Sequence, residues 1–167
     1  QLVLPDPNRH AEGVRVMQRA IRKRPFAAVA YYFLANLLWE QRQFHEATDM
    51  YRFAAALDDR EEQFAEGYFR AARVLEQTPE AMRFLQTRYN RTKGKLAAPA
   101  RALFYALSEQ DEMQSAFGVL EQSAKGQTEP ATDDKNASEV GDVLLFAAEM
   151  RTNYNGPKKG SELLEAA

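Results

Sequence analysis

The chain has 167 residues, with 24 acidic against 22 basic side chains, a formal net charge of −2 and 45% hydrophobic residues. This ordinary globular composition excludes a global field that would recruit nucleic acid or an anionic membrane surface. The absence of cysteine excludes disulfides, thiolate catalysis and sulfur-ligated zinc. It leaves the compartment open, so that cytoplasmic and periplasmic locations are both compatible. No apolar run is long enough for direct membrane insertion.

Helical periodicity dominates the sequence, and strand patterns are nearly absent. Asp6-Pro7 and Thr78-Pro79 are N-cap and first-turn signals that mark two helix starts, and Arg24-Pro25 closes the first helix. Nine helices are predicted, near residues 7–24, 28–41, 44–57, 62–76, 79–90, 97–109, 111–125, 138–152 and 157–166. Residues 126–137 have almost nothing apolar, so we expect a solvated polar loop there.

These helices carry a repeat of about 34 residues. In the first complete unit, large residues stand at positions 4, 7 and 11, a small one at 8, and alanine, an aromatic residue and alanine at 20, 24 and 27: Tyr31, Leu34, Leu38, Ala35, Ala47, Tyr51 and Ala54. The spacing resembles the tetratricopeptide repeat (TPR), in which small residues let two helices approach closely. The resemblance implies an all-α fold, a right-handed superhelical solenoid of antiparallel helix pairs.

The resemblance covers nearly the whole chain, read as a single TPR-like domain over residues 1–167. It comprises the second helix of a partial repeat at 7–24, a repeat at 28–59, a divergent repeat at 62–91, a repeat at 97–125, the polar loop at 126–137 and a terminal divergent repeat at 138–167. In the 62–91 repeat Phe69 takes the small position and Arg88 replaces an alanine, so we expect distorted packing. Because the sequence begins at Gln1 without a methionine, we expect an excised domain or a processed product.

In the tetratricopeptide family the first, or front, helix of each pair lines a concave groove. The family's groove positions carry aromatic and arginine side chains here, which are residue types enriched at protein interfaces. The predicted partner-binding residues are Tyr32, Asn36, Trp39, Arg70, Arg73, Arg101 and Tyr105. For Trp39 and Tyr105 the alternative is packing against neighbouring units as core. Some family members bind a terminal carboxylate through a cationic and asparagine clamp, but only Asn36 matches it, and Gly67 stands where a second asparagine would.

Other functions find little support in the sequence. The basic clusters Arg19–Arg24 and Arg88–Lys95 end predicted helices, where cations complement the helix dipole, so no nucleic-acid interface is predicted. His10 and His45, the only histidines, lack a second imidazole at metal-ligand spacing, and we expect both to face solvent. No phosphate-binding glycine loop or nucleophile elbow is present. We therefore predict no catalysis, no cofactor and no metal site.

The predicted function is a scaffold that binds a partner protein or peptide through the concave groove, with no chemistry of its own. One alternative is a self-assembling, homo-oligomeric repeat module, because the open ends of a repeat array can be covered by another copy. The other is a non-catalytic TPR region of a larger enzyme or envelope assembly.

Overall fold

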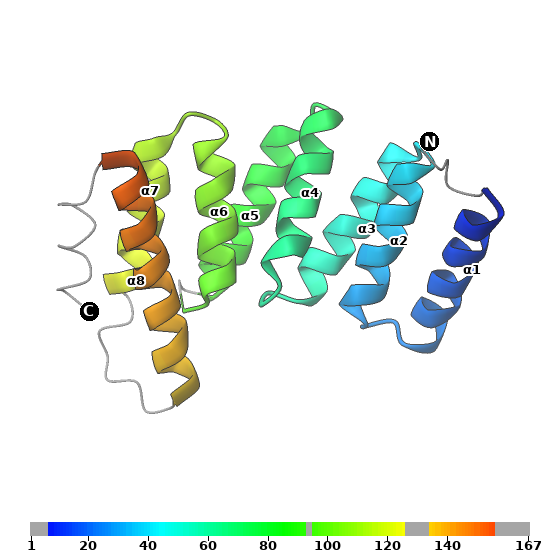
Figure 1. Ribbon diagram of the computed structural model, residues 1–167, viewed down its shortest axis with the longest axis horizontal. Coiled ribbons are helices and arrows are strands. Elements are labelled where there is room, and N and C mark those ends of the chain that lie inside the picture. The colour runs from blue at the N-terminus through cyan, green and yellow to red at the C-terminus, as the bar shows by residue number, and fades with distance from the viewer. Residues whose placement is uncertain (1–6, 93–94, 126–133, 156–167) are drawn as a thin grey trace, which may run out of the picture. The chain divides into compact units, whose positions relative to one another are not determined.

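The computed structural model describes residues 7–92, 95–125 and 134–155 (Figure 1). Within them there are eight helices and no strand, so the predicted all-α fold is confirmed there. The helices are α1 Pro7–Lys23, α2 Ala28–Glu40, α3 Phe44–Leu57, α4 Glu62–Val74, α5 Thr78–Thr92, α6 Ala97–Ser108, α7 Met113–Lys125 and α8 Asp134–Asn155. The chain divides into two compact units, unit 1 (Gln1–Ala81) and unit 2 (Met82–Ala167), which are described separately. The expectation of one continuous domain stays a prediction.

The helix boundaries follow the sequence closely, with one correction in the polar segment. The predicted starts at residues 7, 28, 44, 62 and 97 are confirmed. The predicted loop at 126–137 is wrong at its end, because α8 begins at Asp134 rather than at residue 138. Polar composition does not exclude a helix, because lysine and alanine, which occur at Lys135 and Ala137, have high helix propensity. Residues 126–133 and the predicted ninth helix at 157–166 lie outside the described residues.

The backbone repeats at the turn that follows each front helix. Arg42, Glu76 and Asp111, which come after α2, α4 and α6, have φ values of 61°, 59° and 60°. In each turn the next N–H bonds back to a helix carbonyl: Gln43 to Leu38 at 2.9 Å, Gln77 to Ala72 at 2.8 Å and Glu112 to Leu107 at 3.0 Å. This is the Schellman arrangement of a helix end. The three turns lie 34 and 35 residues apart along the chain, since 76 − 42 = 34 and 111 − 76 = 35. The period of the sequence is therefore also a period of the backbone.

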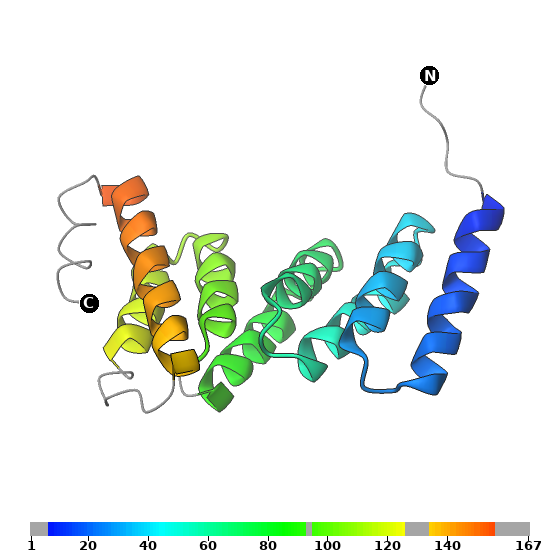
Figure 2. The ribbon, with the colours of Figure 1, turned by 60° about the horizontal axis from the view of Figure 1, so that its bottom comes forward.

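In unit 1, α1 packs against α2, α2 against α3 and α3 against α4. Successive helices of this unit run antiparallel (Figures 1 and 2). Ala35, Ala47 and Ala54, at the small positions of the repeat, have no exposed surface. A larger side chain at any of them would separate α2 from α3. The close packing that the repeat spacing predicts is confirmed in this helix pair.

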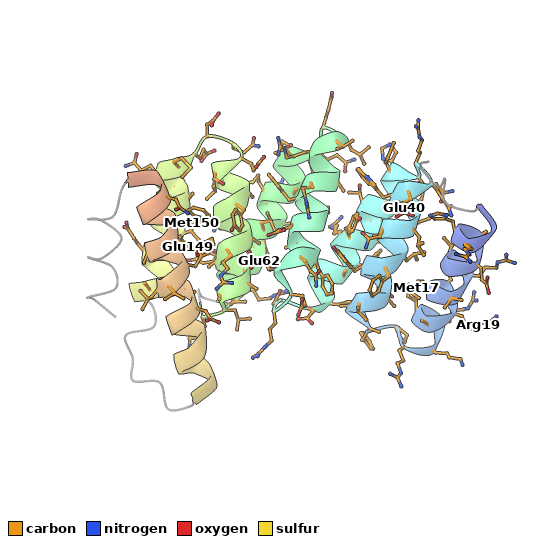
Figure 3. The ribbon with its side chains drawn as sticks, in the orientation of Figure 1. Met17, Arg19, Glu40, Glu62, Glu149 and Met150 are labelled. Carbon is orange, nitrogen blue, oxygen red and sulfur yellow. The ribbon has the colours of Figure 1, made fainter. Side chains whose placement is uncertain are left out.

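The first helix belongs to unit 1 through contacts with α2. Met17 lies on the side of α1 that faces α2, and Arg19 points away from it (Figure 3). The prediction of two solvent-facing histidines is wrong for His10, whose side chain is 17% exposed and bonded to the Glu40 carboxylate. The packing of α1 against α2 brings His10 and Glu40 together. His45 is exposed as expected.

In unit 2, α6 and α7 form a pair, and α8 packs against both. Phe104, which takes the small position of this repeat, is buried, with its ring centroid 5.4 Å from those of Phe117 and Phe146. Ser123 replaces the last alanine and donates a hydrogen bond to Tyr89 Oη at 3.1 Å, while Tyr89 donates to the Val119 carbonyl at 3.3 Å. These bonds join the end of α5 to α7. Departures from the repeat pattern are therefore accommodated by aromatic and polar contacts.

The two divergent side chains of the 62–91 repeat both lie in the interior. Phe69 is 5% exposed and Arg88 is 2% exposed. Burial of Arg88 corrects the sequence interpretation of residues 88–95 as one basic cluster at a helix end. Among its other described members, Arg91 and Lys95 are exposed.

Candidate functional site

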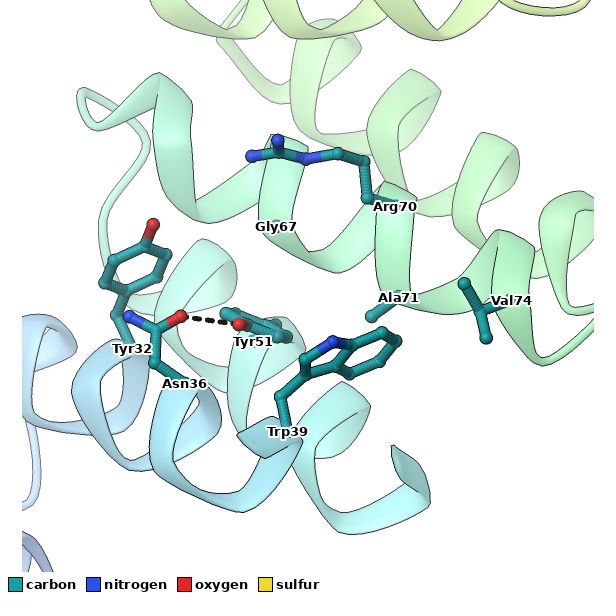
Figure 4. Close-up of a pocket in the computed structure, with 8 residues that line it drawn as sticks. All are labelled: Tyr32, Asn36, Trp39, Tyr51, Gly67, Arg70, Ala71 and Val74. Carbon is teal, nitrogen blue, oxygen red and sulfur yellow. Dashed lines mark hydrogen bonds between the residues drawn. The ribbon is translucent and has the colours of Figure 1, made fainter. Parts of the chain in front are cut away.

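Unit 1 has a pocket of about 330 Å³ between α2 and α4, here called the Trp39 pocket (Figure 4). It is lined by Tyr32, Asn36, Trp39, Tyr51, Gly67, Arg70, Ala71 and Val74. Four of the seven predicted partner-binding residues, Tyr32, Asn36, Trp39 and Arg70, thus share one hollow. The repeat explains this grouping, because the front helices α2 and α4 present corresponding positions toward the same side.

The floor of the Trp39 pocket depends on a glycine. A β-carbon placed on Gly67 would lie 2.9 Å from Tyr51 Cδ1 and 3.4 Å from Tyr32 Cε2. The first distance is shorter than van der Waals contact allows, so only glycine lets the α4 backbone come this close to the Tyr51 ring. An asparagine side chain at this position would collide with Tyr51.

A hydrogen bond orients the polar groups of the Trp39 pocket. Tyr51 donates its hydroxyl hydrogen to Asn36 Oδ1 at 2.5 Å (Figure 4). Burial raises the pKa of Tyr51 above its ordinary value of 10.0, and the neighbouring Tyr32 raises it further. The phenol therefore stays protonated near neutral pH. The bond directs the Asn36 Nδ2 group, with its two donor hydrogens, to the Tyr32 side of the pocket.

Aromatic rings form the walls of this pocket. The Trp39 ring lies edge-on to Phe44 of α3, with centroids 4.7 Å apart. The Tyr32 ring lies 5.6 Å from Tyr51 and 5.0 Å from Phe64, measured between centroids. Trp39 and Tyr32 are both partly exposed. Trp39 therefore packs on Phe44 of its own repeat, whereas the core alternative expected contact with a neighbouring unit, and it also presents indole surface to the pocket.

Arg70 is the only charged residue among the eight that line the Trp39 pocket. Its side chain is 69% exposed, and its guanidinium lies 3.7 Å from the Glu66 carboxylate one helical turn earlier. Exposed pairs of this kind on a helix contribute only about 0.3–0.5 kcal/mol. A ligand carboxylate can therefore compete for the guanidinium at little cost.

The other three predicted residues lie elsewhere. Arg73 is exposed on α4 and has its guanidinium carbon 5.9 Å from the Phe69 ring centroid, outside the pocket lining. Arg101 and Tyr105 belong to α6 of unit 2. Arg101 lies over the Phe146 ring at 5.1 Å and donates to the Asp142 carbonyl at 3.2 Å. Whether Arg73, Arg101 and Tyr105 contact a partner stays a prediction.

Tyr105 shows the packing that the core alternative described. Its ring centroid lies 5.5 Å from that of Phe146 and 5.7 Å from that of Phe104. The side chain nevertheless remains 37% exposed. Tyr105 therefore packs on α8 with one part of its ring and meets solvent with another.

Sequence reasoning missed half of the pocket lining, namely Tyr51, Gly67, Ala71 and Val74. The repeat pattern predicts Tyr51 as a core residue and marks Gly67 only as a departure from the carboxylate clamp. A glycine inside a helix costs about 1 kcal/mol relative to alanine, and it often marks a close approach. That signal was present at Gly67.

A second pocket adjoins the first at the beginning of α2 and α4 and is here called the Phe26 pocket. Its volume is about 450 Å³, and its lining is Phe26, Ala28, Val29, Leu57, Asp58, Glu61, Gln63 and Phe64. The only charged residues among these eight are the two carboxylates. Apolar surface with an acidic edge distinguishes it from the Trp39 pocket.

The described residues carry no group of three or more histidine, aspartate or glutamate side chains that could hold a metal ion. In the same residues, no helix combines the length and the apolar character needed to cross a membrane.

The described helix pairs share a repeat period, a helix-end turn and close alanine packing, which are the features that the resemblance to the tetratricopeptide repeat implies. No protein-family model and no curated protein sequence matches the chain. One similar solved structure is YrrB, described as a TPR protein with an unusual peptide-binding site, at 17% identity and a TM-score of 0.46 over 95% of this chain and 76% of that one. Another is MamA, at 10% identity and a TM-score of 0.47 over 91% of this chain and 82% of that one.

Proposed function

We propose that this chain is a protein-interaction module, and that unit 1 binds an extended segment of a partner protein along the furrow between α2 and α4. The supporting observation is the Trp39 pocket, which joins four predicted interface residues in one hollow. Partly exposed aromatic rings supply apolar area with few rotatable bonds, Asn36 supplies donors held in place by Tyr51, and Arg70 supplies an exposed guanidinium. An apolar anchor side chain with a nearby backbone carbonyl or carboxylate fits this arrangement.

The lining of the Trp39 pocket favours binding over chemistry. Its eight residues include no carboxylate and no imidazole, the groups that most often serve as general acid and base. The volume of about 330 Å³ is at the lower end of the range of about 300–1,000 Å³ for small-molecule pockets. A side chain of a longer ligand is therefore the better match.

A peptide-display experiment tests this proposal. Random dodecamers are selected on the full chain, and the selected peptides are then synthesised and titrated by fluorescence anisotropy against wild type and Trp39→Ala. Loss of a central aromatic anchor costs about 2 kcal/mol, so we expect binding to weaken about thirtyfold. Failure to select any peptide overturns the proposal.

Phe53→Ala is the matched control. Phe53 is an aromatic residue of α3 with 52% of its surface exposed, and it lines neither pocket. Its substitution should change peptide affinity by less than about twofold, the effect of a residue outside the contact surface. An equal loss in both variants places the binding surface elsewhere.

Substitution of two arginines of α4 distinguishes binding in the Trp39 pocket from binding along the wider groove. Arg70→Ala should weaken the selected peptides about threefold to tenfold, because it removes the only guanidinium of the pocket. Arg73→Ala, one turn further along α4 and outside the lining, should have a smaller effect. A larger loss from Arg73→Ala shifts the contact surface toward the end of α4.

The alternatives of self-assembly and of a repeat region within a larger enzyme or envelope assembly stay predictions. Multi-angle light scattering over a concentration series tests the first. A constant monomer mass removes it, whereas a rising mass supports it.

A further inference from the structure

The two pockets of unit 1 meet at one pair of aromatic rings. Tyr32 lines the Trp39 pocket and Phe64 lines the Phe26 pocket, and their ring centroids are 5.0 Å apart. Each pocket also draws its lining from both α2 and α4. A single extended ligand can therefore pass from one pocket to the other across the Tyr32–Phe64 contact.

The two pockets carry opposite charge. Arg70 is the one charged residue in the lining of the Trp39 pocket, whereas Asp58 and Glu61 are the charged residues of the Phe26 pocket. The side chain of Glu61 accepts a hydrogen bond from Gln63 Nε2 at 3.0 Å, and Asp58 Oδ1 accepts one from the Arg60 backbone N–H at 2.9 Å. Both carboxylates have further partners within the chain, and a cationic ligand group would compete with these for the acceptor positions, of which a carboxylate offers about four.

The apolar part of the Phe26 pocket suits the stem of a basic side chain. Phe26 is 85% exposed and Val29 is 51% exposed. Lysine and arginine place their methylene groups along apolar surface and leave the charged end among polar partners. Here the charged end would reach Asp58 and Glu61.

The helices set the spacing between the two pockets. On α2 the lining residues move from Ala28 and Val29 to Tyr32, Asn36 and Trp39, a mean shift of about seven residues, or roughly 10 Å at 1.5 Å per residue. Glu61, which directly precedes α4, and Arg70 of α4 are nine positions apart, or roughly 13 Å along the helix. An extended peptide advances about 3.3 Å per residue, so the two charges it presents should be about three or four residues apart.

We infer that the partner segment is bipolar, with an acidic side chain at Arg70 and a basic side chain three or four residues away at Asp58 and Glu61. This inference rests on the proposed function and names the chemical class of its ligand. The two charged positions together add no net charge to the segment, in keeping with one pocket lined by Arg70 and the other by Asp58 and Glu61.

The test starts from the peptides that display selects on the full chain. Each is synthesised in four versions that differ only at the two charged positions: one base and one acid as selected, two acids, two bases, and two glutamines. Two exposed ion pairs and the removal of like-charge repulsion together predict that the bipolar version binds about tenfold more tightly than the two like-charged versions. The glutamine version also has zero net charge at these two positions, but it forms no ion pair, so it should bind about threefold less tightly than the bipolar version.

Charge reversal in the protein locates each end of the peptide. Arg70→Glu should weaken the bipolar peptide, and a version with lysine in place of its acid should bind this variant more tightly than it binds wild type. Glu61→Lys is the corresponding change at the other end, and a version with glutamate in place of the base should restore its binding. Glu61 makes no side-chain hydrogen bond that caps α4, and the substitution removes the bond that its carboxylate accepts from Gln63 Nε2.

The outcomes separate the two proposals. If the selected peptides need Trp39 but bind equally well in all four versions, the bipolar inference is overturned and the proposed function stands. If charge reversal is not rescued by the swapped peptides, the assignment of the two ends is overturned. If no peptide is selected, the proposed function fails and the inference fails with it.

Discussion

The two units differ in what lies against the inner side of a front helix. In unit 1 the helix facing α2 presents Gly67, and a pocket remains over Tyr51 between α2 and α4. In unit 2 the helix facing α6 presents Phe146, whose ring meets Phe104 and Tyr105 and lies under Arg101. A glycine therefore leaves a pocket beside the front helix in unit 1, whereas a phenylalanine fills the corresponding space in unit 2.

This difference separates two roles for groove residues that the sequence pattern treats alike. The polar and aromatic side chains around the Trp39 pocket keep surface available to a ligand, with Asn36 held by Tyr51. Arg101 is engaged within unit 2 by a ring and a carbonyl of α8. Family position alone does not decide whether such a residue binds a partner or fastens the next helix.

Phe146→Ala should have the largest effect on stability and tests the packing of α8 in unit 2. The ring is 8% exposed and contacts Phe104, Tyr105 and Arg101, so we expect its loss to lower the free energy of unfolding by about 3–4 kcal/mol. Leu145→Ala, in the same helix at 64% exposure, is the control and should cost less than about 0.5 kcal/mol. Urea denaturation followed by circular dichroism measures both. Equal small effects would show that α8 does not depend on this contact.

Gly67→Ala and Gly118→Ala should change stability in opposite directions. A β-carbon at Gly67 meets Tyr51 Cδ1 at 2.9 Å, and overpacking of this kind should lower the free energy of unfolding by about 1–2 kcal/mol. A β-carbon at Gly118 of α7 meets nothing within 4 Å, so alanine should raise the free energy of unfolding by about 0.5–1 kcal/mol through its higher helix propensity. Thermal unfolding of the two variants measures the difference. A stabilising Gly67→Ala would argue against a tight floor to the pocket.

The repeat and most helix boundaries were predictable because they depend on local patterns. Ala35, Ala47 and Ala54 indicate closely packed helix pairs, and residue pairs that contain proline mark where helices start and end. Pocket membership depends instead on which atoms of two distant segments meet. That Gly67 faces the Tyr51 ring, 16 positions earlier in the chain, cannot be inferred from either residue alone.

The helix-end turns show a further limit of sequence reasoning. Left-handed positions usually carry glycine or asparagine, but here they carry Arg42, Glu76 and Asp111. The residue types gave no sign of positive φ, and only their spacing shows the pattern. Likewise, the sequence predicts Arg88 in a basic cluster at a helix end, whereas it is 2% exposed, because burial of an arginine is rare and depends on tertiary contacts.

Glu76→Gly and Asp111→Gly should stabilise the two units by similar small amounts. Both residues have φ near 60°, where glycine has no steric penalty, so each substitution should raise the free energy of unfolding by about 0.5–1 kcal/mol. Both turns have the same hydrogen bond back to the helix, which is the reason to expect equal effects. The denaturation midpoints of the two variants measure these changes in stability. A gain in one unit alone would show that the turns differ in strain despite their matching geometry.

The ionisation of Tyr51 gives the smallest and most local test of the Trp39 pocket. Burial raises the pKa of Tyr51 above 10.0, so the unfolded phenol ionises first as the pH rises. The resulting stabilisation is fully present below pH 10.0 and is lost as the pH rises through the higher folded pKa. Urea denaturation at pH 9, 10 and 11 should therefore show declining stability in wild type and a shallower decline in Tyr51→Phe.

Part of this decline should persist in Tyr51→Phe, because burial also raises the pKa of Tyr68 in the same unit. The Tyr51→Phe, Tyr68→Phe double variant should have the shallowest decline of the set. Identical pH slopes in wild type and Tyr51→Phe would mean that Tyr51 ionises as readily in the folded chain as in the unfolded one. That result would contradict a buried phenol held against Asn36 and Gly67, and with it the closed floor that distinguishes the pocket of unit 1.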